Sequence, residues 1–197
     1  MQPRSSYHHG NLREALLEAA VALIGESGSK TFTLREVARR AGVTHNAPYR
    51  HFQDKDELLA AVGTQGFEEL TNAMLDAASS HKKALTRLKA AGLAYIAFAL
   101  RRPEHFAVMF DVACKPGASA SSAAAEQSFN TLLEFAKACQ REGQLPSGDP
   151  LRSALLAWSM VHGIAKLATA ECLPYKSETD ILSFAKFVMD ELLNQNK

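Results

Sequence analysis

Apolar residues recur along this chain at the three- and four-residue spacing of amphipathic helices, and the two-residue alternation of a β-strand is absent. This pattern predicts an all-α fold of about nine helices. Three short helices fall within residues 11–52, and a long helix follows over residues 54–79. The remaining five span residues 81–101, 104–112, 123–142, 151–172 and 177–194. We therefore expect an N-terminal domain over residues 1–55, joined through the long helix to a larger helical domain over residues 56–197.

Residues 33–52 (TLREVARRAGVTHNAPYRHF) have the spacing of two short helices joined by a tight turn. The apolar face of the first helix is formed by Leu34, Val37, Ala38 and Ala41. Gly42 can end that helix because glycine adopts the left-handed conformation without a Cβ clash. Val43 would then fill the angle between the helices, and Thr44 is a favourable N-cap for the second. The segment is predicted to be a helix-turn-helix, whose second helix enters the major groove of DNA.

The second helix of this unit presents polar side chains outward. His45 and Asn46 lie near its N-terminus, and an asparagine can pair with an adenine edge. Pro48 removes one early backbone donor, at a far lower cost than in the middle of a helix. Tyr49 is expected to place its hydroxyl on a phosphate. A plain helical hairpin inside a bundle is the alternative, although a polar second helix would then have no use.

The two C-terminal helices are apolar on more than one side. A helix that is apolar all round must be buried all round, so one side is expected to face the chain's own core and another a second subunit. The small residues of the helix over residues 151–172 would allow another helix to approach closely. We expect a four-helix dimer interface formed by Ala154, Val161, Ala165, Ala168, Ile181, Phe184, Ala185, Val188 and Leu192. A central helix within a monomer is the alternative.

Charge and cysteine content narrow the class of protein. Residues 1–55 carry eight Lys and Arg against five acids, whereas the rest of the chain carries fourteen against sixteen, so the basic excess lies where phosphates would be met. Cys114, Cys139 and Cys172 are odd in number and far apart, which favours reduced, buried cysteines over disulfides or a zinc site.

The chain shows no apolar run of membrane-spanning length and no secretory signal, so we expect a cytoplasmic protein without membrane contact. The segment before the first helix contains Arg4 and the pair His8–His9. It is interpreted either as a disordered tail or as an arm that reaches the DNA. Two histidines without a third ligand do not indicate a metal site.

The motifs over residues 11–59 resemble the N-terminal domain of the TetR family of transcriptional repressors. The matching runs are A-x-x-L-I-x-E-x-G at residues 20–28, TLREVARRAGVT at residues 33–44 and YRHFxDKDELL at residues 49–59. The resemblance implies a homodimer that binds a palindromic double-stranded operator and is released when a small molecule enters the C-terminal domain. By position, the DNA surface would consist of Thr33, Arg35, Thr44, His45, Asn46, Ala47, Tyr49, Arg50, His51 and Lys55.

Pro48 departs from the aliphatic residue that is common at its place in the family. Together with the W-x-x-x-H-G run of Trp158, His162 and Gly163, it resembles a subset of that family whose ligands the motif does not define. The resemblance also implies a ligand pocket within the C-terminal domain. Its candidate lining is Phe67, Leu70, Met74, Phe98, Phe106, Met109, Phe110, Phe129, Leu133, Trp158 and His162. Aromatic and methionine residues at helical spacing are more often part of a plain core.

These observations predict a ligand-responsive repressor whose effector is small and hydrophobic or amphipathic. The chain contains no nucleophile–base pair, phosphate-binding loop or metal-ligand spacing, so we expect neither an enzyme nor a bound cofactor or metal. The alternative is an all-α small-molecule-binding protein or enzyme whose helical hairpin does not bind DNA.

Overall fold

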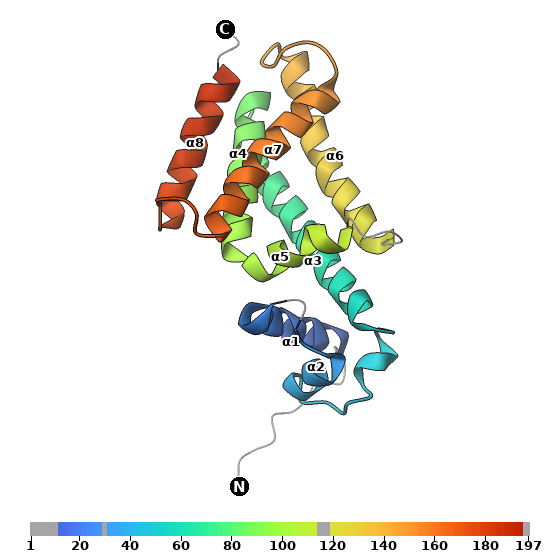
Figure 1. Ribbon diagram of the computed structural model, residues 1–197. Coiled ribbons are helices and arrows are strands. Elements are labelled where there is room, and N and C mark those ends of the chain that lie inside the picture. Colours follow the sequence, from blue (N-terminus) through green and yellow to red (C-terminus); the bar gives the residue numbers. More distant parts are fainter. Residues whose placement is uncertain (1–11, 29–30, 114–118, 195–197) are drawn as a thin grey trace.

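The computed structural model describes residues 12–28, 31–113 and 119–194. Within these ranges it contains eight α-helices, one short 3-10 helix and no strand, which confirms the all-α prediction (Figure 1). The elements are α1 (Leu12–Ser27), α2 (Leu34–Arg40), η1 (Pro48–Arg50), α3 (Lys55–Ser79), α4 (Ala84–Arg101), α5 (Pro103–Ala113), α6 (Ser119–Arg141), α7 (Pro150–Thr169) and α8 (Glu178–Asn194).

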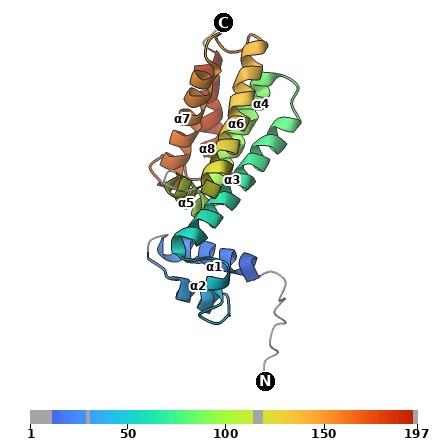
Figure 2. The same ribbon diagram turned by 90° about the vertical axis from the view of Figure 1, so that its right-hand side faces the viewer.

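The helices form two stacked parts. The N-terminal unit, made of α1, α2 and η1, lies at one end of the molecule, and the body, made of α4 to α8, lies at the other (Figure 1). The long helix α3 leaves the N-terminal unit and continues through the body, as the turned view in Figure 2 shows. Within the body, α4 is central, because it contacts α3, α5, α6, α7 and α8.

Each part has its own hydrophobic core, and α5 belongs to both. Val108 and Val112 pack into the core of the N-terminal unit, whereas Phe106 and Met109 on the same helix pack into the core of the body. Helix α3 is shared in the same way along its length. These two helices therefore connect the parts through packed side chains.

Several helix ends follow the expected capping chemistry. The side chain of Thr33 accepts a hydrogen bond from the Glu36 backbone at 3.3 Å, and the Glu36 carboxylate accepts one from the Thr33 backbone at 2.7 Å, so the two residues form a capping box. Asp54 caps α3 through the backbone N–H of Glu57 at 2.9 Å. Gly42 has φ +70°, as its role at the end of α2 requires.

The structure corrects the predicted use of α7 and α8. Ala154, Val161, Ala165, Ala168, Ile181 and Ala185 are buried within the chain itself, so they are not available to a second subunit. The physical reason is close packing against α4: a Cβ on Gly92 would lie 3.2 Å from Val161, which shows how near the two helices approach. Phe184 and Val188 are half-buried against the core of the body. Of the predicted set, Leu192 alone is exposed.

Smaller expectations are also corrected. Cys139 is buried as predicted, but Cys172 is exposed in the turn after α7. Helix α6 begins at Ser119, earlier than the expected residue 123. Arg4, His8, His9 and Cys114 lie outside the described residues. Among the residues that are described, no helix is long and apolar enough to cross a membrane, and no three His, Cys, Asp or Glu side chains gather as metal ligands would.

Candidate nucleic-acid interface and ligand pocket

The turn between α2 and the following segment is built by backbone hydrogen bonds. After Gly42, the N–H of Val43 bonds to the carbonyl of Ala38 at 3.0 Å, which is the long bond of a Schellman motif. Val43 is partly buried against the core of the N-terminal unit, where it fills the angle as predicted. The geometry turns the chain sharply and directs residues 44–51 across the end of the molecule.

These residues form a turn and a 3-10 helix in place of the predicted continuous α-helix. Pro48 has no N–H, so the α-helical bond to the carbonyl of Thr44 cannot form. That carbonyl instead accepts from the N–H of Ala47 at 2.9 Å. Thr44 therefore does not act as a side-chain cap, and η1 begins after Ala47 without one. The recognition segment is consequently tighter than an α-helix.

Most of the predicted DNA-binding side chains lie on the surface of the N-terminal unit. Tyr49 is 53% exposed, and its neighbours Thr44, His45, Asn46, Arg50 and His51 are also exposed. Ala47 is the exception, because it is 8% exposed and packs inward with Pro48. The prediction that Ala47 presents its side chain to DNA is therefore wrong.

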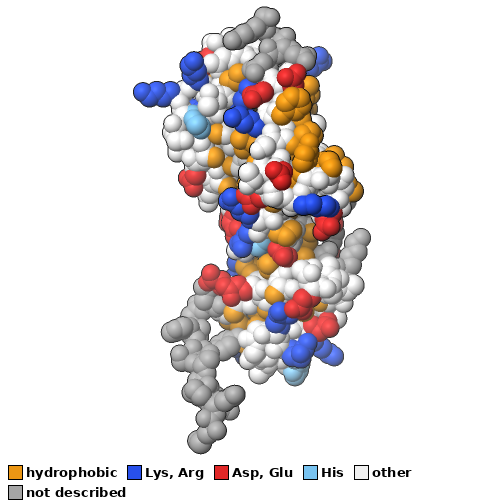
Figure 3. Space-filling model, turned by 90° about the vertical axis from the view of Figure 1, so that its left-hand side faces the viewer, with side chains coloured by type: hydrophobic (Ala, Val, Ile, Leu, Met, Phe, Trp, Pro, Cys, Tyr) orange, Lys and Arg blue, Asp and Glu red, His pale blue; other side chains and the backbone are white. Residues whose placement is uncertain are grey.

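Arg35, Thr33 and Lys55 surround this segment. Arg35 is exposed on α2. Thr33 uses its hydroxyl within the capping box, where it lies 2.9 Å from a carboxylate oxygen of Glu36. The hydrogen bond from Thr33 lowers the pKa of Glu36. Lys55 is half-buried, and its ammonium donates to the carbonyl of Phe32 at 3.1 Å. Basic side chains are visible near this end of the molecule in Figure 3.

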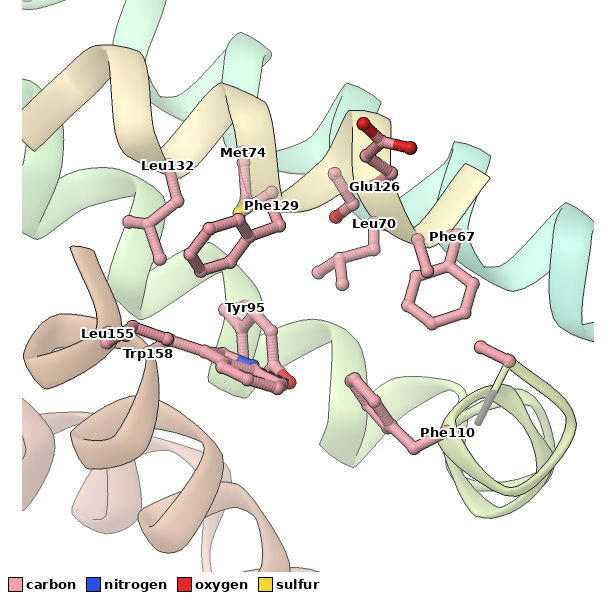
Figure 4. A pocket seen from close by; sticks show the side chains of 13 residues that line it. Phe67, Leu70, Met74, Tyr95, Phe110, Glu126, Phe129, Leu132, Leu155 and Trp158 are labelled. Atoms are coloured by element: carbon pink, nitrogen blue, oxygen red, sulfur yellow. Dashed lines mark hydrogen bonds between the residues drawn. The ribbon is translucent and has the colours of Figure 1, made fainter. Parts of the chain in front are cut away.

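A cavity of about 330 Å³ lies inside the body, between α3, α4, α5, α6 and α7 (Figure 4). It is lined almost entirely by apolar side chains. The lining consists of Phe67, Leu70, Met74, Tyr95, Phe110, Ala113, Ala125, Glu126, Ser128, Phe129, Leu132, Leu155 and Trp158. Glu126 and Leu155 are exposed and therefore mark where the cavity meets solvent.

The predicted pocket set overlaps the lining of this cavity. Six of its members line the cavity, namely Phe67, Leu70, Met74, Phe110, Phe129 and Trp158. The other five do not line it: Phe98, Phe106, Met109, Leu133 and His162 pack in the surrounding core. The prediction missed Tyr95, which lies three residues before Phe98 on α4. Helical spacing cannot tell which of these two aromatic rings turns toward the space.

The aromatic side chains around the cavity enclose one polar network. The hydroxyl of Tyr95 lies 2.8 Å from Nδ1 of His162, and the indole N–H of Trp158 donates to that hydroxyl at 3.4 Å. Burial raises the pKa of Tyr95 above its ordinary range, so the hydroxyl keeps its proton. Burial and the nearby Lys166 lower the pKa of His162.

An exposed polar helix-turn-helix unit, joined by one long helix to a body that holds an apolar cavity, defines a DNA-binding regulator with a ligand-binding domain. Two family descriptions match the chain: "Bacterial regulatory proteins, tetR family" over residues 16–62 and "Tetracyclin repressor-like, C-terminal domain" over residues 88–192. The chain belongs to the TetR family, whose members are DNA-binding transcriptional regulators and not enzymes.

Solved structures agree with this assignment. A protein of unknown function from Rhodococcus sp. RHA1 is 34% identical, covers 94% of this chain and 97% of its own, and has a TM-score of 0.83. FadR from Bacillus subtilis, in complex with stearoyl-CoA, is 15% identical, with 93% and 98% covered and a TM-score of 0.78. AibR, in complex with isovaleryl coenzyme A and operator DNA, is 22% identical, with 92% and 97% covered and a TM-score of 0.74. The last two share the fold alone.

Proposed function

We propose that this transcriptional regulator is a repressor that binds a palindromic operator as a homodimer and is released by a small hydrophobic or amphipathic effector. The observation that carries the proposal is the position of the apolar cavity beside α3. Phe67 and Met74 on α3 line the cavity, and Leu58 near the start of the same helix packs in the core of the N-terminal unit. A ligand that moves α3 therefore moves the DNA-binding surface.

Close packing of α3 on α5 supports this coupling. A Cβ on Gly63 would lie 2.5 Å from Val112, and a Cβ on Gly66 would lie 2.7 Å from the sulfur of Met109. Such contacts leave no room for the two helices to slide independently. Because Phe110 on α5 also lines the cavity, an effector would displace both helices together.

We propose the exposed polar side chains of the N-terminal unit as the DNA surface. Arg50 and Arg35 supply positive charge to phosphates, and His45 and Asn46 are short enough to read base edges. Thr33, Thr44, Tyr49, His51 and Lys55 complete the surface. In this proposal residues 1–55 are the DNA-binding domain, and residues 56–197 bind the effector and form the dimer. Because the proposed target is DNA, we propose that the protein acts in the cytoplasm.

A second copy of the chain is proposed to cover the exposed apolar side chains of α7 and α8. Leu156 is 63% exposed and Phe187 is 60% exposed, while Leu167 and Leu192 are 48% and 50% exposed. Figure 3 shows hydrophobic side chains gathered along one edge of the body. A two-fold pair of reading units would match an operator whose half-sites are one helical turn of DNA apart, about 34 Å, or a multiple of that.

The W-x-x-x-H-G run supports placing the chain in the corresponding subset of the family. Trp158 lines the cavity, and His162 holds the hydroxyl of Tyr95 one layer behind it, so the motif contributes to the proposed effector site. FadR was solved in complex with stearoyl-CoA and AibR in complex with isovaleryl coenzyme A. These complexes support a ligand-binding role for a protein of this fold.

The test is DNA binding measured by fluorescence anisotropy, with the DNA upstream of the protein's own gene and a scrambled duplex at about 0.15 M salt. We expect a clear preference for a palindromic segment. Tyr49→Ala should weaken that binding about tenfold, since one phosphate contact and its packing are lost. Tyr175→Ala, which removes an exposed tyrosine from the body, should leave the affinity for the palindromic segment unchanged.

Equal affinity for the palindrome and the scrambled duplex would overturn the proposal. The chain would then be an all-α small-molecule-binding protein whose helical hairpin does not bind DNA. If Tyr49→Ala binds the operator as the unmodified protein does, Tyr49 leaves the DNA surface.

A further inference from the structure

The lining of the cavity is strongly biased toward apolar side chains. Aromatic and aliphatic side chains form almost all of it, and Lys and Arg are absent from the described residues that line it. Glu126 is the one charged member of that described lining, and in Figure 4 its carboxylate points away from the other labelled side chains. A ligand carboxylate or phosphate inside would lose its water without gaining a cationic partner, which is a heavy cost.

Tyr95 and Ser128 are the two hydroxyl-bearing residues of the described lining. In Figure 4 the ring of Tyr95 lies beside the indole of Trp158, and its hydroxyl is held by His162 and Trp158. A tyrosine hydroxyl can donate one hydrogen bond and accept two. Trp158 can only donate, so it takes one accepting position of the hydroxyl.

His162 takes a second position, whichever tautomer it adopts. If Nδ1 carries the proton, it donates to Tyr95, and the hydroxyl of Tyr95 remains free to donate. If Nδ1 is unprotonated, the hydroxyl donates to it, and one accepting position remains. In both cases Tyr95 has one unused hydrogen-bonding position. A ligand hydroxyl is the group that suits both cases, because it donates and accepts.

We propose that the effector site selects uncharged, hydroxyl-bearing hydrophobes, such as an alkylphenol or a long-chain alcohol, and that Tyr95 is the residue that recognises the hydroxyl. The proposal rests on the proposed function, since it takes this cavity to be the effector pocket. Phe67, Phe110, Phe129 and Trp158 surround the apolar part of the ligand, and a described lining without Lys or Arg disfavours its anionic analogues.

The test uses three probes that differ in one group: 4-pentylphenol, pentylbenzene and 4-pentylbenzoate. Binding is followed through the fluorescence of Trp158, the chain's single tryptophan and a member of the cavity lining. We expect the phenol to bind about tenfold more tightly than pentylbenzene, which is the effect of one net hydrogen bond. The benzoate should bind more weakly than either.

Two variants test which residue causes the preference for the phenol over pentylbenzene. Tyr95→Phe removes the hydroxyl alone and should bring the phenol and pentylbenzene to equal affinity. Ser128→Ala removes the other hydroxyl of the described lining and should leave the tenfold preference intact. The comparison of the three probes on the unmodified protein does not depend on whether either variant folds.

The proposal is overturned if pentylbenzene or the benzoate binds as tightly as the phenol, if Tyr95→Phe keeps the preference, or if no probe changes the fluorescence of Trp158. DNA binding without any ligand is measured separately. A protein that prefers its operator but ignores the phenol contradicts the ligand class alone. A protein that binds the phenol but has no operator contradicts the regulator function alone.

Discussion

Two buried polar side chains of the body are in opposite situations. The hydroxyl of Tyr95 has two hydrogen-bond partners, whereas both ring nitrogens of His105, a residue 2% exposed, have no hydrogen-bond partner among the described residues. His105 lies on α5 where that helix meets α1 and α3. With Glu14, Glu18 and Gln65 it lines a second cavity of about 480 Å³ at this junction.

His105 makes the stability of the junction sensitive to acid. Burial is the largest cause that lowers its pKa, and Arg102 adds to it, against the opposite effects of Glu69 and Glu104. An unfolded histidine titrates near pH 6.5, at about its ordinary pKa. Below that pH the unfolded chain binds a proton that the folded chain refuses, so the free energy of unfolding falls as the pH falls.

We expect the melting temperature to fall between pH 7.5 and pH 5.5, and to fall less in His105→Leu. The loss is at most about 1.4 kcal/mol for each pH unit below 6.5, until the folded histidine itself titrates. His162 contributes in the same direction, because its pKa is also lowered. Thermal unfolding at the two pH values measures the effect, with His81→Gln, at an exposed site, as the control. Equal pH dependence in all three proteins would contradict this role of His105.

At the scale of the elements, the decisive feature is the joint between α2 and the recognition segment. Gly42 has φ +70°, and Pro48 lacks the donor that an α-helix from Thr44 would need. The first residue sets the direction of the chain and the second sets its tight winding. Together they determine how Tyr49 and Arg50 are presented.

Gly42→Ala is expected to destabilise the protein by about 1 kcal/mol, because a Cβ is unfavourable in the left-handed conformation. Gly42→Asn should lose less, since asparagine tolerates that conformation best among residues with a side chain. Chemical denaturation of the three proteins provides the measurement. An unchanged or raised free energy of unfolding in Gly42→Ala would show that this conformation is not required.

At the scale of the whole molecule, α3 and α5 connect two cores, and α7 and α8 leave an apolar surface uncovered. The exposed side chains Leu156 and Phe187 lie far along the chain from the recognition segment. The proposed palindromic operator nevertheless requires both the recognition segment and this exposed apolar surface. We therefore propose that the cavity, the connecting helices α3 and α5, and the exposed surface of α7 and α8 act together as one switch.

Leu156→Glu combined with Phe187→Glu should convert the dimer to a monomer, because two charges would be buried in each half of the interface. Sedimentation velocity gives the mass, and anisotropy should show weaker binding to the palindrome. Leu75→Glu changes another exposed leucine, on α3, and should leave the proposed dimer intact. A doubly substituted protein that still sediments as a dimer would place the interface elsewhere.

The sequence alone determined the helices, the capping box at Thr33, the turn at Gly42 and the family, because these depend on residues within a few positions of one another. It also identified four of the five aromatic residues in the described cavity lining. These are local properties, and the tertiary structure left them largely unchanged. The recognition segment is the local exception. The sequence shows that Pro48 lacks an N–H, but the predicted α-helix is replaced by a turn and a 3-10 helix.

Only the tertiary structure decided which apolar face of α7 is covered. Val161 and Leu156 lie on two apolar faces of one helix, and periodicity cannot rank them. The face that contains Val161 packs on Gly92 of α4, and this packing leaves Leu156 exposed. The same limit explains why Tyr95 lines the cavity while Phe98 does not. A side chain's neighbours across the fold, set by how closely two backbones approach, are not encoded in the spacing of its own helix.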